Sequence, residues 1–261
     1  MLKQIDINDI ISIAQKAGDA IMEVYAKDFD VEYKDDKSPI TEADKIANGI
    51  IENGLLALSI QFPILSEEGK EVLDEERKGW EYFWMVDPLD GTKEFIKKNG
   101  EFTVNIALIH NGFPVLGVVY APALNELYWA KQGNGAFKNN ERLPLYINQN
   151  TDKLLRIVAS KSHLSSETQK YIDNLAKSTE KIECISKGSS LKLCMIADGS
   201  ADIYPRLAPT MEWDTAAADA ILREAGGATM IWEMEAYLKY NKINLLNPWF
   251  ICSLQKKELN V

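Results

Sequence analysis

The sequence has few of the residues on which histidine- and cysteine-based sites depend. Its 261 residues include two histidines and three cysteines. Cys184, Cys194 and Cys252 are odd in number and widely spaced, without a C-x-x-C pair, which argues against a disulfide framework and a zinc site and indicates a reducing compartment. We expect structural or solvated roles for His110, at the mouth of a predicted hairpin, and for His163, in a predicted loop.

Long apolar segments are also lacking. No stretch reaches the roughly 18 consecutive apolar residues of a membrane-spanning helix, and the first residues, Met1 to Asp6, contain no signal-peptide core. We therefore expect a cytoplasmic protein without an integral membrane segment, either free or peripheral at the inner face of the cell membrane. Both a monomer and a homodimer are compatible with the sequence.

Basic residues are outnumbered by acidic ones. There are 29 Lys and Arg against 39 Asp and Glu, which gives a formal net charge of −10. Because such an acidic surface repels phosphate backbones, we do not expect a nucleic-acid binder. The 46% hydrophobic content excludes a disordered chain, and the length suits one large domain or two smaller ones sharing a core.

The motifs of several common chemistries are missing as well. The sequence contains no G-x-S-x-G, no G-x-x-x-x-G-K-[ST], no G-x-G-x-x-G and no H-E-x-x-H. These absences argue against the serine hydrolases, nucleotide-binding loops and zinc proteases that such motifs mark.

Hydrophobic periodicity predicts two long helices first, then strands, then alternating strands and helices. Helices are predicted from the N-cap Asp6, at 42–58, 166–177 and 190–198, and from Asp214; strands are predicted at 31–33, 62–65, 82–86, 103–110, 115–121, 126–131, 155–160, 182–186, 201–204 and 250–252. The Asn111-Gly112 pair between two apolar runs indicates a hairpin. This order predicts layered sheets and helices, with an α+β part over 1–145 and an α/β part over 146–261.

Acidic residues follow directly on the apolar strand 82–86. In Asp87-Pro88-Leu89-Asp90-Gly91-Thr92, two carboxylates three residues apart can converge on one cation. Gly91 permits a close approach to the backbone, and the amides of Gly91 and Thr92 can face an anion. The alternative is an Asx-type turn, in which both aspartates only bond the backbone.

Four other acidic residues likewise have a functional and a structural interpretation. Glu67 and Glu68 follow the preceding strand, where a solvated turn is the alternative and at most one of them faces inward. Asp214 begins an alanine-rich helix and Asp44 follows Thr41 by three residues, so an N-cap and a capping box are the respective alternatives.

Taken together, these residues form a donor set without nitrogen or sulfur. Glu67, Asp87, Asp90 and Asp214, with Asp44 nearby, offer only oxygen ligands, which Mg²⁺ and Mn²⁺ prefer. The first three follow consecutive strands and can be neighbours, whereas the position of Asp214 depends on the fold.

Four motifs in order resemble those of the inositol monophosphatase superfamily of Mg²⁺-dependent, lithium-sensitive phosphatases. They are D-K-S-P-I-T-E-A-D (36–44), S-E-E-G (66–69), D-P-L-D-G-T (87–92), and E-W-D-T-A-A-A-D-A-I-L with E-A-G-G (212–227). The resemblance runs from about residue 10 to the C-terminus. The segments 93–95, 187–192, 204–214 and 245–250 are most similar to the 3′(2′),5′-bisphosphate nucleotidase branch.

The resemblance implies a mixed α/β fold, a layered α-β-α-β-α sandwich, and a metal site. Two or three Mg²⁺ ions, which Mn²⁺ can replace, would be bound by Glu67, Asp87, the Leu89 carbonyl, Asp90 and Asp214. Li⁺ would inhibit. Glu67 and Thr92 would position the attacking water, with Asp44 close by as a third catalytic residue.

The resemblance also implies the reaction. The substrate would be adenosine 3′(2′),5′-bisphosphate, or its sulfated relative, and the 3′(2′)-phosphate would be released to leave AMP, which recycles a by-product of sulfate assimilation. The implied substrate-binding residues are Glu67, Leu89, Asp90, Gly91, Thr92, Asp214, Lys187, Ser189, Lys192 and Arg206. Trp213 and Tyr204 either stack on the base or pack in the core. The alternatives are an inositol or sugar monophosphatase and a non-catalytic metal- or nucleotide-binding module.

Overall fold

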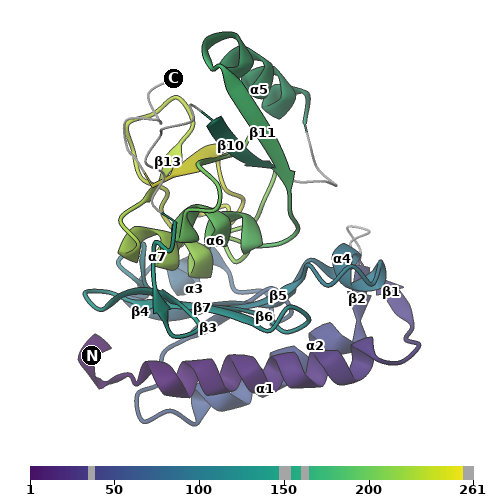
Figure 1. The fold of residues 1–261 in the computed structure, drawn as a ribbon. Helices are drawn as coiled ribbons and strands as arrows, with labels where there is room; N and C mark the ends of the chain where they lie inside the picture. Colours follow the sequence, from purple (N-terminus) through teal and green to yellow (C-terminus); the bar gives the residue numbers. More distant parts are fainter. Residues whose placement is uncertain (35–38, 147–153, 160–164, 255–261) are drawn as a thin grey trace.

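Helices and sheets alternate in five stacked layers (Figure 1). The computed structural model describes residues 1–34, 39–146, 154–159 and 165–254. From the bottom of Figure 1 upward, the layers are two long helices, a seven-stranded sheet, two shorter helices, a five-stranded sheet and one outer helix. This order confirms the predicted α-β-α-β-α sandwich.

The first layer consists of α1 (Ile7–Tyr25) and α2 (Glu42–Leu56), after a short 3-10 turn, η1 (Leu2–Gln4). Asp6 caps α1 as predicted, because its Oδ1 accepts a hydrogen bond from the Asn8 amide at 2.9 Å. Between the helices, β1 (Val31–Tyr33) and β2 (Pro39–Thr41) form a small antiparallel sheet. Within the described ranges, no helix has both the length and the apolar composition needed to cross a bilayer.

The second layer is the seven-stranded sheet, whose strands lie in chain order. They are β3 (Ile64–Ser66), β4 (Tyr82–Asp90), β5 (Thr103–His110), β6 (Phe113–Ala121), β7 (Glu126–Lys131), β8 (Gly135–Lys138) and β9 (Glu141–Arg142). β3 is parallel to β4 and the other pairs are antiparallel. Successive side chains of β4 point to opposite faces of the sheet. Trp84 and Val86 pack with the helices of the first layer, and Phe83 and Met85 pack with those of the third. Because both faces are buried, the strand is apolar at consecutive positions.

The third layer consists of α6 (Leu191–Asp198) and α7 (Ala216–Glu224). α7 approaches the seven-stranded sheet so closely that a Cβ at Gly117, in β6, would lie 2.1 Å from the Ala217 carbonyl oxygen. Only glycine fits there. The close contact fixes the start of α7, and with it the segment just before the helix, relative to the first sheet.

The fourth layer is the five-stranded sheet, in the order β11-β10-β12-β14-β13. Its strands are β10 (Leu154–Ala159), β11 (Lys181–Ser186), β12 (Ile203–Arg206), β13 (Ala228–Ile231) and β14 (Phe250–Ser253). The outer helix, α5 (Ser166–Ser178), covers the far face, with Tyr171, Ile172 and Leu175 in an apolar cluster.

Several boundaries differ from the sequence prediction. β4 continues through Asp90 instead of ending at Val86, because Asp87 and Asp90 still pair with β5 around a bulge. The strand predicted at 201–204 lies at 203–206, and α7 begins at Ala216 rather than at Asp214. The prediction also missed β2, α3 (Asp74–Arg77), α4 (Thr92–Ile96), β8, β9 and β13.

His110 is not among the residues that line the acidic cavity. His110 ends β5, stacks on Tyr82 with ring centroids 4.0 Å apart, and lies 3.3 Å from Glu81 Oε1. These contacts agree with the structural role expected for it. His163 lies outside the described residues.

Candidate active site

A cavity of about 220 Å³ collects residues from both sheets and from the segments between them. Its lining contains most of the residues expected from the sequence: Glu67, Asp87, Leu89, Asp90, Gly91, Thr92, Ser189, Lys192, Arg206 and Asp214. The predicted Asp44 and Lys187 are not part of this lining. The cavity is therefore the candidate site for metal and substrate binding.

Three acidic side chains converge at one end of the cavity. Glu67, just after β3, Asp87, in β4, and Asp214, just before α7, each offer an oxygen, and these oxygens lie within 4.8 Å of one another. Asp87 is only 2% exposed, and its Oδ1 also accepts the Leu89 amide at 3.1 Å. The structure thus contains both the Asx-type turn and the convergent cluster that the sequence left as alternatives for Asp87.

Burial and mutual repulsion make the charged forms of these carboxyls unfavourable. Burial raises the pKa of Asp87 well above its usual value, and the carboxylates of Glu67 and Asp90 raise it further. Burial also raises the pKa values of Glu67 and Asp214, and burial together with the Asp214 carboxylate raises the pKa of Asp90 to about 6. A divalent cation would relieve this repulsion, and an all-oxygen donor set suits Mg²⁺ or Mn²⁺.

Asp90 lies beside this cluster but outside it. It lines the same cavity, yet its Oδ2 accepts hydrogen bonds from the amide and the hydroxyl of Ser190 at 2.6 and 2.9 Å. The β4–β5 pairing places Asp90 opposite Thr103, on the far side of the bulge from Asp87. The two aspartates of the 87–92 motif therefore have different surroundings.

Lys34 supplies a positive charge that the sequence analysis did not predict. Its Nζ lies 3.0 Å from Glu67 Oε1 and 2.5 Å from Glu68 Oε1. Burial opposes the charge, but the Glu67 and Glu68 carboxylates outweigh it and raise the pKa of Lys34. Of the two glutamates, only Glu67 lines the cavity.

The turn after β4 places a hydroxyl next to the acidic cluster. Gly91 has a φ of 94°, and a Cβ there would lie 3.1 Å from the Glu101 carbonyl oxygen, so the turn requires glycine. The following Thr92 Oγ1 lies 3.3 Å from Asp44 Oδ1 and 3.4 Å from the Leu89 carbonyl oxygen.

Asp44 has a structural contact on each side. Its Oδ2 accepts both the amide and the hydroxyl of Thr41 at 2.7 Å, which completes the capping box of α2. Its Oδ1 faces Thr92. The capping box that the sequence left as the alternative for Asp44 is present, and it leaves one oxygen for the cavity side.

Basic and hydroxyl groups line another part of the cavity. Buried Lys192 donates to the Ser189 carbonyl at 2.5 Å, and burial lowers the pKa of Lys192 to about 8. Among the described residues, Ser189 Oγ and Arg206 Nε are buried without a hydrogen-bond partner. Lys187, by contrast, lies outside the lining, with its Nζ 3.4 Å from Glu101 Oε1.

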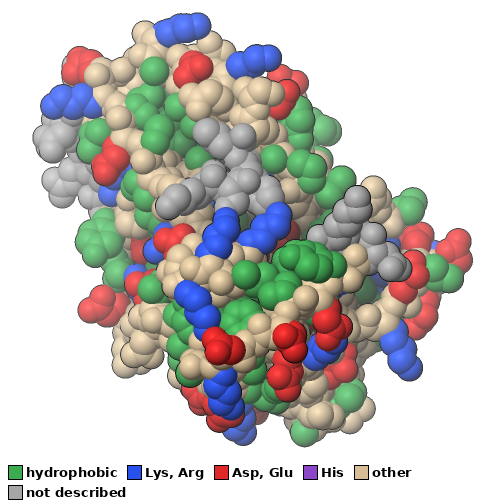
Figure 2. Space-filling model, turned by 90° about the vertical axis from the view of Figure 1, so that its right-hand side faces the viewer, with side chains coloured by type: hydrophobic (Ala, Val, Ile, Leu, Met, Phe, Trp, Pro, Cys, Tyr) green, Lys and Arg blue, Asp and Glu red, His purple; other side chains and the backbone are tan. Residues whose placement is uncertain are grey.

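The face that carries α4, β1 and β2 is turned toward the viewer in Figure 2. Lys and Arg side chains gather near the middle of this face (Figure 2). A protein with a net charge of −10 thus presents a group of basic side chains on this face.

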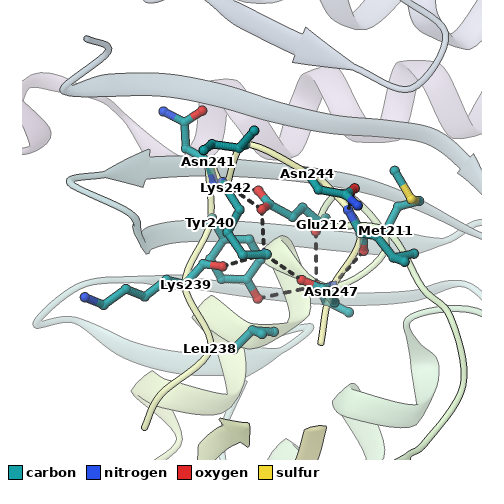
Figure 3. Close-up of polar contacts among 12 residues, drawn as sticks. Met211, Glu212, Leu238, Lys239, Tyr240, Asn241, Lys242, Asn244 and Asn247 are labelled. Carbon is teal, nitrogen blue, oxygen red and sulfur yellow. Dashed lines mark hydrogen bonds and ion pairs between the residues drawn. The ribbon is translucent and has the colours of Figure 1, made fainter. Parts of the chain in front are cut away.

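A buried network holds the segment that carries Asp214 (Figure 3). Asp214 Oδ2 accepts from the Thr210 hydroxyl at 2.6 Å and the Met211 amide at 2.9 Å. Glu212, which follows Met211, has no exposed surface. Its carboxylate accepts hydrogen bonds from the Asn241 amide, the Lys242 amide and Lys242 Nζ. Asp214 therefore does not cap α7 with its side chain. Its orientation comes from this irregular segment.

The same network reaches the segment that follows Glu67. Arg77, at the end of α3, donates to the Asn241 side chain and to the carbonyls of Lys242 and Ile243 at 2.6–2.9 Å. Asn247 donates to the Met211 carbonyl at 2.9 Å. One loop therefore connects the segments on which two of the clustered carboxylates lie.

Sequence reasoning missed the residues that support the site. Lys34, Asn105, Ser190, Glu212 and Arg77 were not selected. Two of them had a usable signal: Asn105 is a lone amide within an apolar strand, and Glu212 is an acidic residue directly before Trp213-Asp214. The other three had none, because their partners lie far away in the sequence.

Comparison with known proteins defines the class to which this fold and acidic cavity belong. The sequence model of the inositol monophosphatase family matches residues 3–259. The chain belongs to the inositol monophosphatase family.

Several named relatives resemble the chain over nearly its full length. The 3′(2′),5′-bisphosphate nucleotidase CysQ of Escherichia coli O157:H7 is 44% identical over 253 residues, which cover 95% of this chain and 99% of that protein. The CysQ of Haemophilus influenzae is 35% identical, with 94% and 91% covered. The crystal structure of CysQ from Bacteroides thetaiotaomicron has a TM-score of 0.86 and 46% identity, with 95% of this chain and 98% of that chain covered. The IMPase of Thermotoga maritima has a TM-score of 0.77 and 27% identity, with 97% and 94% covered.

Proposed function

We propose that this protein is a Mg²⁺-dependent phosphomonoesterase that removes the 3′(2′)-phosphate of adenosine 3′(2′),5′-bisphosphate. The observation that carries the proposal is the convergence of Glu67, Asp87 and Asp214 in a cavity that also contains Thr92, Lys192 and Arg206. The names of its relatives, which are 3′(2′),5′-bisphosphate nucleotidases, support the nucleotide substrate. The products would be AMP and phosphate, and the role would be the recycling of a by-product of sulfate assimilation.

The acidic cluster would hold the metal ions. Glu67, Asp87 and Asp214, with Asp90 and the Leu89 carbonyl, are the proposed ligands for two or three Mg²⁺, and Mn²⁺ would fit the same oxygens. Bound metal would activate a water for attack and stabilise the departing ribose oxygen. Inhibition by Li⁺ is part of the proposal.

Thr92 and Asp44 would orient the attacking water. Since the Thr92 hydroxyl has Asp44 Oδ1 within reach at 3.3 Å, its proton can point there and leave the oxygen lone pairs free to accept from water. Glu67, at the same end of the cavity, would accept the second hydrogen bond of that water. The amides of Gly91 and Thr92 would hold the phosphate that is cleaved.

The basic part of the cavity would bind the second phosphate. Arg206 Nε and Ser189 Oγ lack partners among the described residues, and Lys192 is a buried cation. Phosphate oxygens can satisfy these donors, whereas a monophosphate such as inositol 1-phosphate brings no second phosphate to them. In this proposal, the parts 1–145 and 146–261 work as one unit, because each contributes ligands to the cavity.

The test is a substrate panel with the purified protein and Mg²⁺. We expect phosphate release from adenosine 3′,5′-bisphosphate, and from its 5′-phosphosulfate relative, to exceed release from inositol 1-phosphate. Asp87→Asn should lower Mg²⁺-dependent turnover at least about 100-fold. A clear preference for inositol 1-phosphate would reject the nucleotidase assignment, and full activity of Asp87→Asn would reject the catalytic metal site.

A further inference from the structure

Ser190 occupies the N-cap position of α6 but does not cap the helix. A serine at this position usually accepts a hydrogen bond from an amide in the first turn. Here no such side-chain bond forms. The side chain, 2% exposed, is instead directed toward the acidic cavity, with its Oγ 2.9 Å from Asp90 Oδ2 and 2.6 Å from the Asp214 carbonyl oxygen. The hydroxyl thus lies between Asp90, in the seven-stranded sheet, and the segment that precedes α7.

Asn105 completes this arrangement from the neighbouring strand. It lies opposite Asp87 in the β4–β5 register, and its Nδ2 is 2.8 Å from Ser190 Oγ and 3.4 Å from Asp90 Oδ2. Its Oδ1 is buried and has no partner among the described residues. An orphaned buried acceptor costs stability. The orientation of the Asn105 side chain therefore favours its Nδ2 group, which donates hydrogen bonds to Ser190 and Asp90.

The donors around Asp90 lie on the side of one oxygen, Oδ2. The Ser190 amide donates to Oδ2 at 2.6 Å and Asn105 Nδ2 lies 3.4 Å from it. The single proton of the Ser190 hydroxyl is within reach of both Oδ2, at 2.9 Å, and the Asp214 carbonyl oxygen, at 2.6 Å. Within the described part of the chain, no hydrogen bond to Oδ1 is found. Asp90 is thereby held in one orientation, with Oδ1 available to a cation in the cavity, next to the cluster of Glu67, Asp87 and Asp214.

We propose that Ser190 and Asn105 are positioning residues for Asp90 and that a second divalent-cation site, adjacent to the Glu67–Asp87–Asp214 cluster, depends on them. This inference rests on the proposed function and adds two residues to it. Groups that hydrogen-bond metal ligands commonly change metal affinity or activity by about 10- to 100-fold when they are removed. Loss of the Ser190 hydroxyl should therefore weaken this second site and leave the first largely intact.

The decisive experiment is a Mn²⁺ titration of the substrate-free protein, with free Mn²⁺ measured by electron paramagnetic resonance. We expect two classes of site in the unmodified protein. Ser190→Ala should weaken one class by about 10- to 100-fold, and Ser190→Thr, which keeps the hydroxyl, should restore it. Thr103→Val is the matched control, because the Thr103 hydroxyl is buried opposite Asp90 without a partner among the described residues; its titration should match that of the unmodified protein.

Kinetics provide the second measurement. With adenosine 3′,5′-bisphosphate as substrate, Ser190→Ala should need more Mg²⁺ for half-maximal kcat and approach the normal kcat at high Mg²⁺, which general structural damage would not produce. Identical Mn²⁺ titrations of Ser190→Ala and the unmodified protein, or an equal loss in Thr103→Val, would overturn the inference.

Two further outcomes keep the inference separate from the proposed function. If Ser190→Ala does not fold, Asn105→Ala should weaken the same class of site, and an unchanged titration would again overturn the inference. If the unmodified protein binds Mn²⁺ at two sites but does not hydrolyse the bisphosphate, the proposed function fails while the Mn²⁺ comparison still decides the role of Ser190.

Discussion

The carboxylate of Glu212, which has no exposed surface, lies 2.6 Å from Lys242 Nζ. Two backbone amides complete its hydrogen bonds, so the charge is paired in a buried setting. Because the Lys242 side chain is only partly buried, loss of the charged acceptor costs about as much as a hydrogen bond to a charged group, about 1.5–3 kcal/mol.

We therefore predict that Glu212→Gln lowers the free energy of unfolding by about 1.5–3 kcal/mol, measured by urea denaturation. The exposed Lys45–Glu32 pair is the control, because Lys45→Met should cost no more than about 1 kcal/mol. Similar losses in the two variants would show that the buried network does not anchor the Asp214 segment.

The Thr92 hydroxyl is predicted to matter for turnover rather than for stability. Thr92→Val keeps the shape of the side chain but removes the contact with Asp44 Oδ1. We expect kcat to fall by about 10²- to 10⁴-fold, which is typical for the loss of a group that handles a proton, while the melting temperature stays nearly constant. Steady-state kinetics and thermal unfolding measure the two effects. A kcat within twofold of normal would remove Thr92 from the mechanism.

The acidic cluster predicts a stability that depends on pH and metal together. The pKa of Asp90 is raised to about 6, and those of Asp87, Asp214 and Glu67 are also raised by burial. Because each folded-state pKa exceeds the unfolded value, these carboxyls favour folding when protonated, and this contribution is lost as the pH rises through about 6.

We therefore expect the metal-free protein, in EDTA, to melt at a lower temperature at pH 7.5 than at pH 5. Mg²⁺ at about 100 times its Kd should restore about 2.7 kcal/mol at pH 7.5, or roughly 5–10 °C, and less at pH 5, where protons compete. An equal effect of Mg²⁺ at both pH values in thermal unfolding would contradict the assignment of these carboxyls as ligands.

Lys192 is predicted to select substrates with two phosphates. A charge-assisted hydrogen bond is worth about 1.5–3 kcal/mol, so Lys192→Met should raise KM for adenosine 3′,5′-bisphosphate by about 10- to 150-fold. Hydrolysis of 3′-AMP, which lacks the second phosphate, should change much less. Lys181→Met, at an exposed position of β11, controls for the loss of one positive charge. Equal effects of Lys192→Met on both substrates would place Lys192 elsewhere in the mechanism.

Local sequence signals predicted the parts of the site that lie next to buried strands. Asp87 and Glu67 could be selected because each follows an apolar run, and strand ends of one sheet lie together. The exact course of β4 could not be predicted, because the bulge between Asp87 and Asp90 depends on pairing with β5. Asp214 was selected for a helix start, but the structure orients it through Thr210 and Met211.

The supporting contacts could not be predicted for a physical reason. Ser190 meets Asp90 across 100 residues and Arg77 meets Lys242 across 165, so neither spacing nor periodicity marks them. Such contacts form only when both sheets have packed against the central helices. Family resemblance supplied the roles of the cavity residues. It did not indicate which residues donate hydrogen bonds to those cavity residues.

The ion pairs of Lys34 with Glu67 and Glu68 have a consequence for how the protein takes up metal. A divalent ion bound by Glu67 would compete with the Lys34 ammonium group for this carboxylate, so we expect cation uptake to weaken the ion pair. Lys34 directly follows β1 of the small antiparallel sheet. Occupancy of the acidic cluster would thereby change the contacts of Lys34, a residue that is not itself a proposed metal ligand.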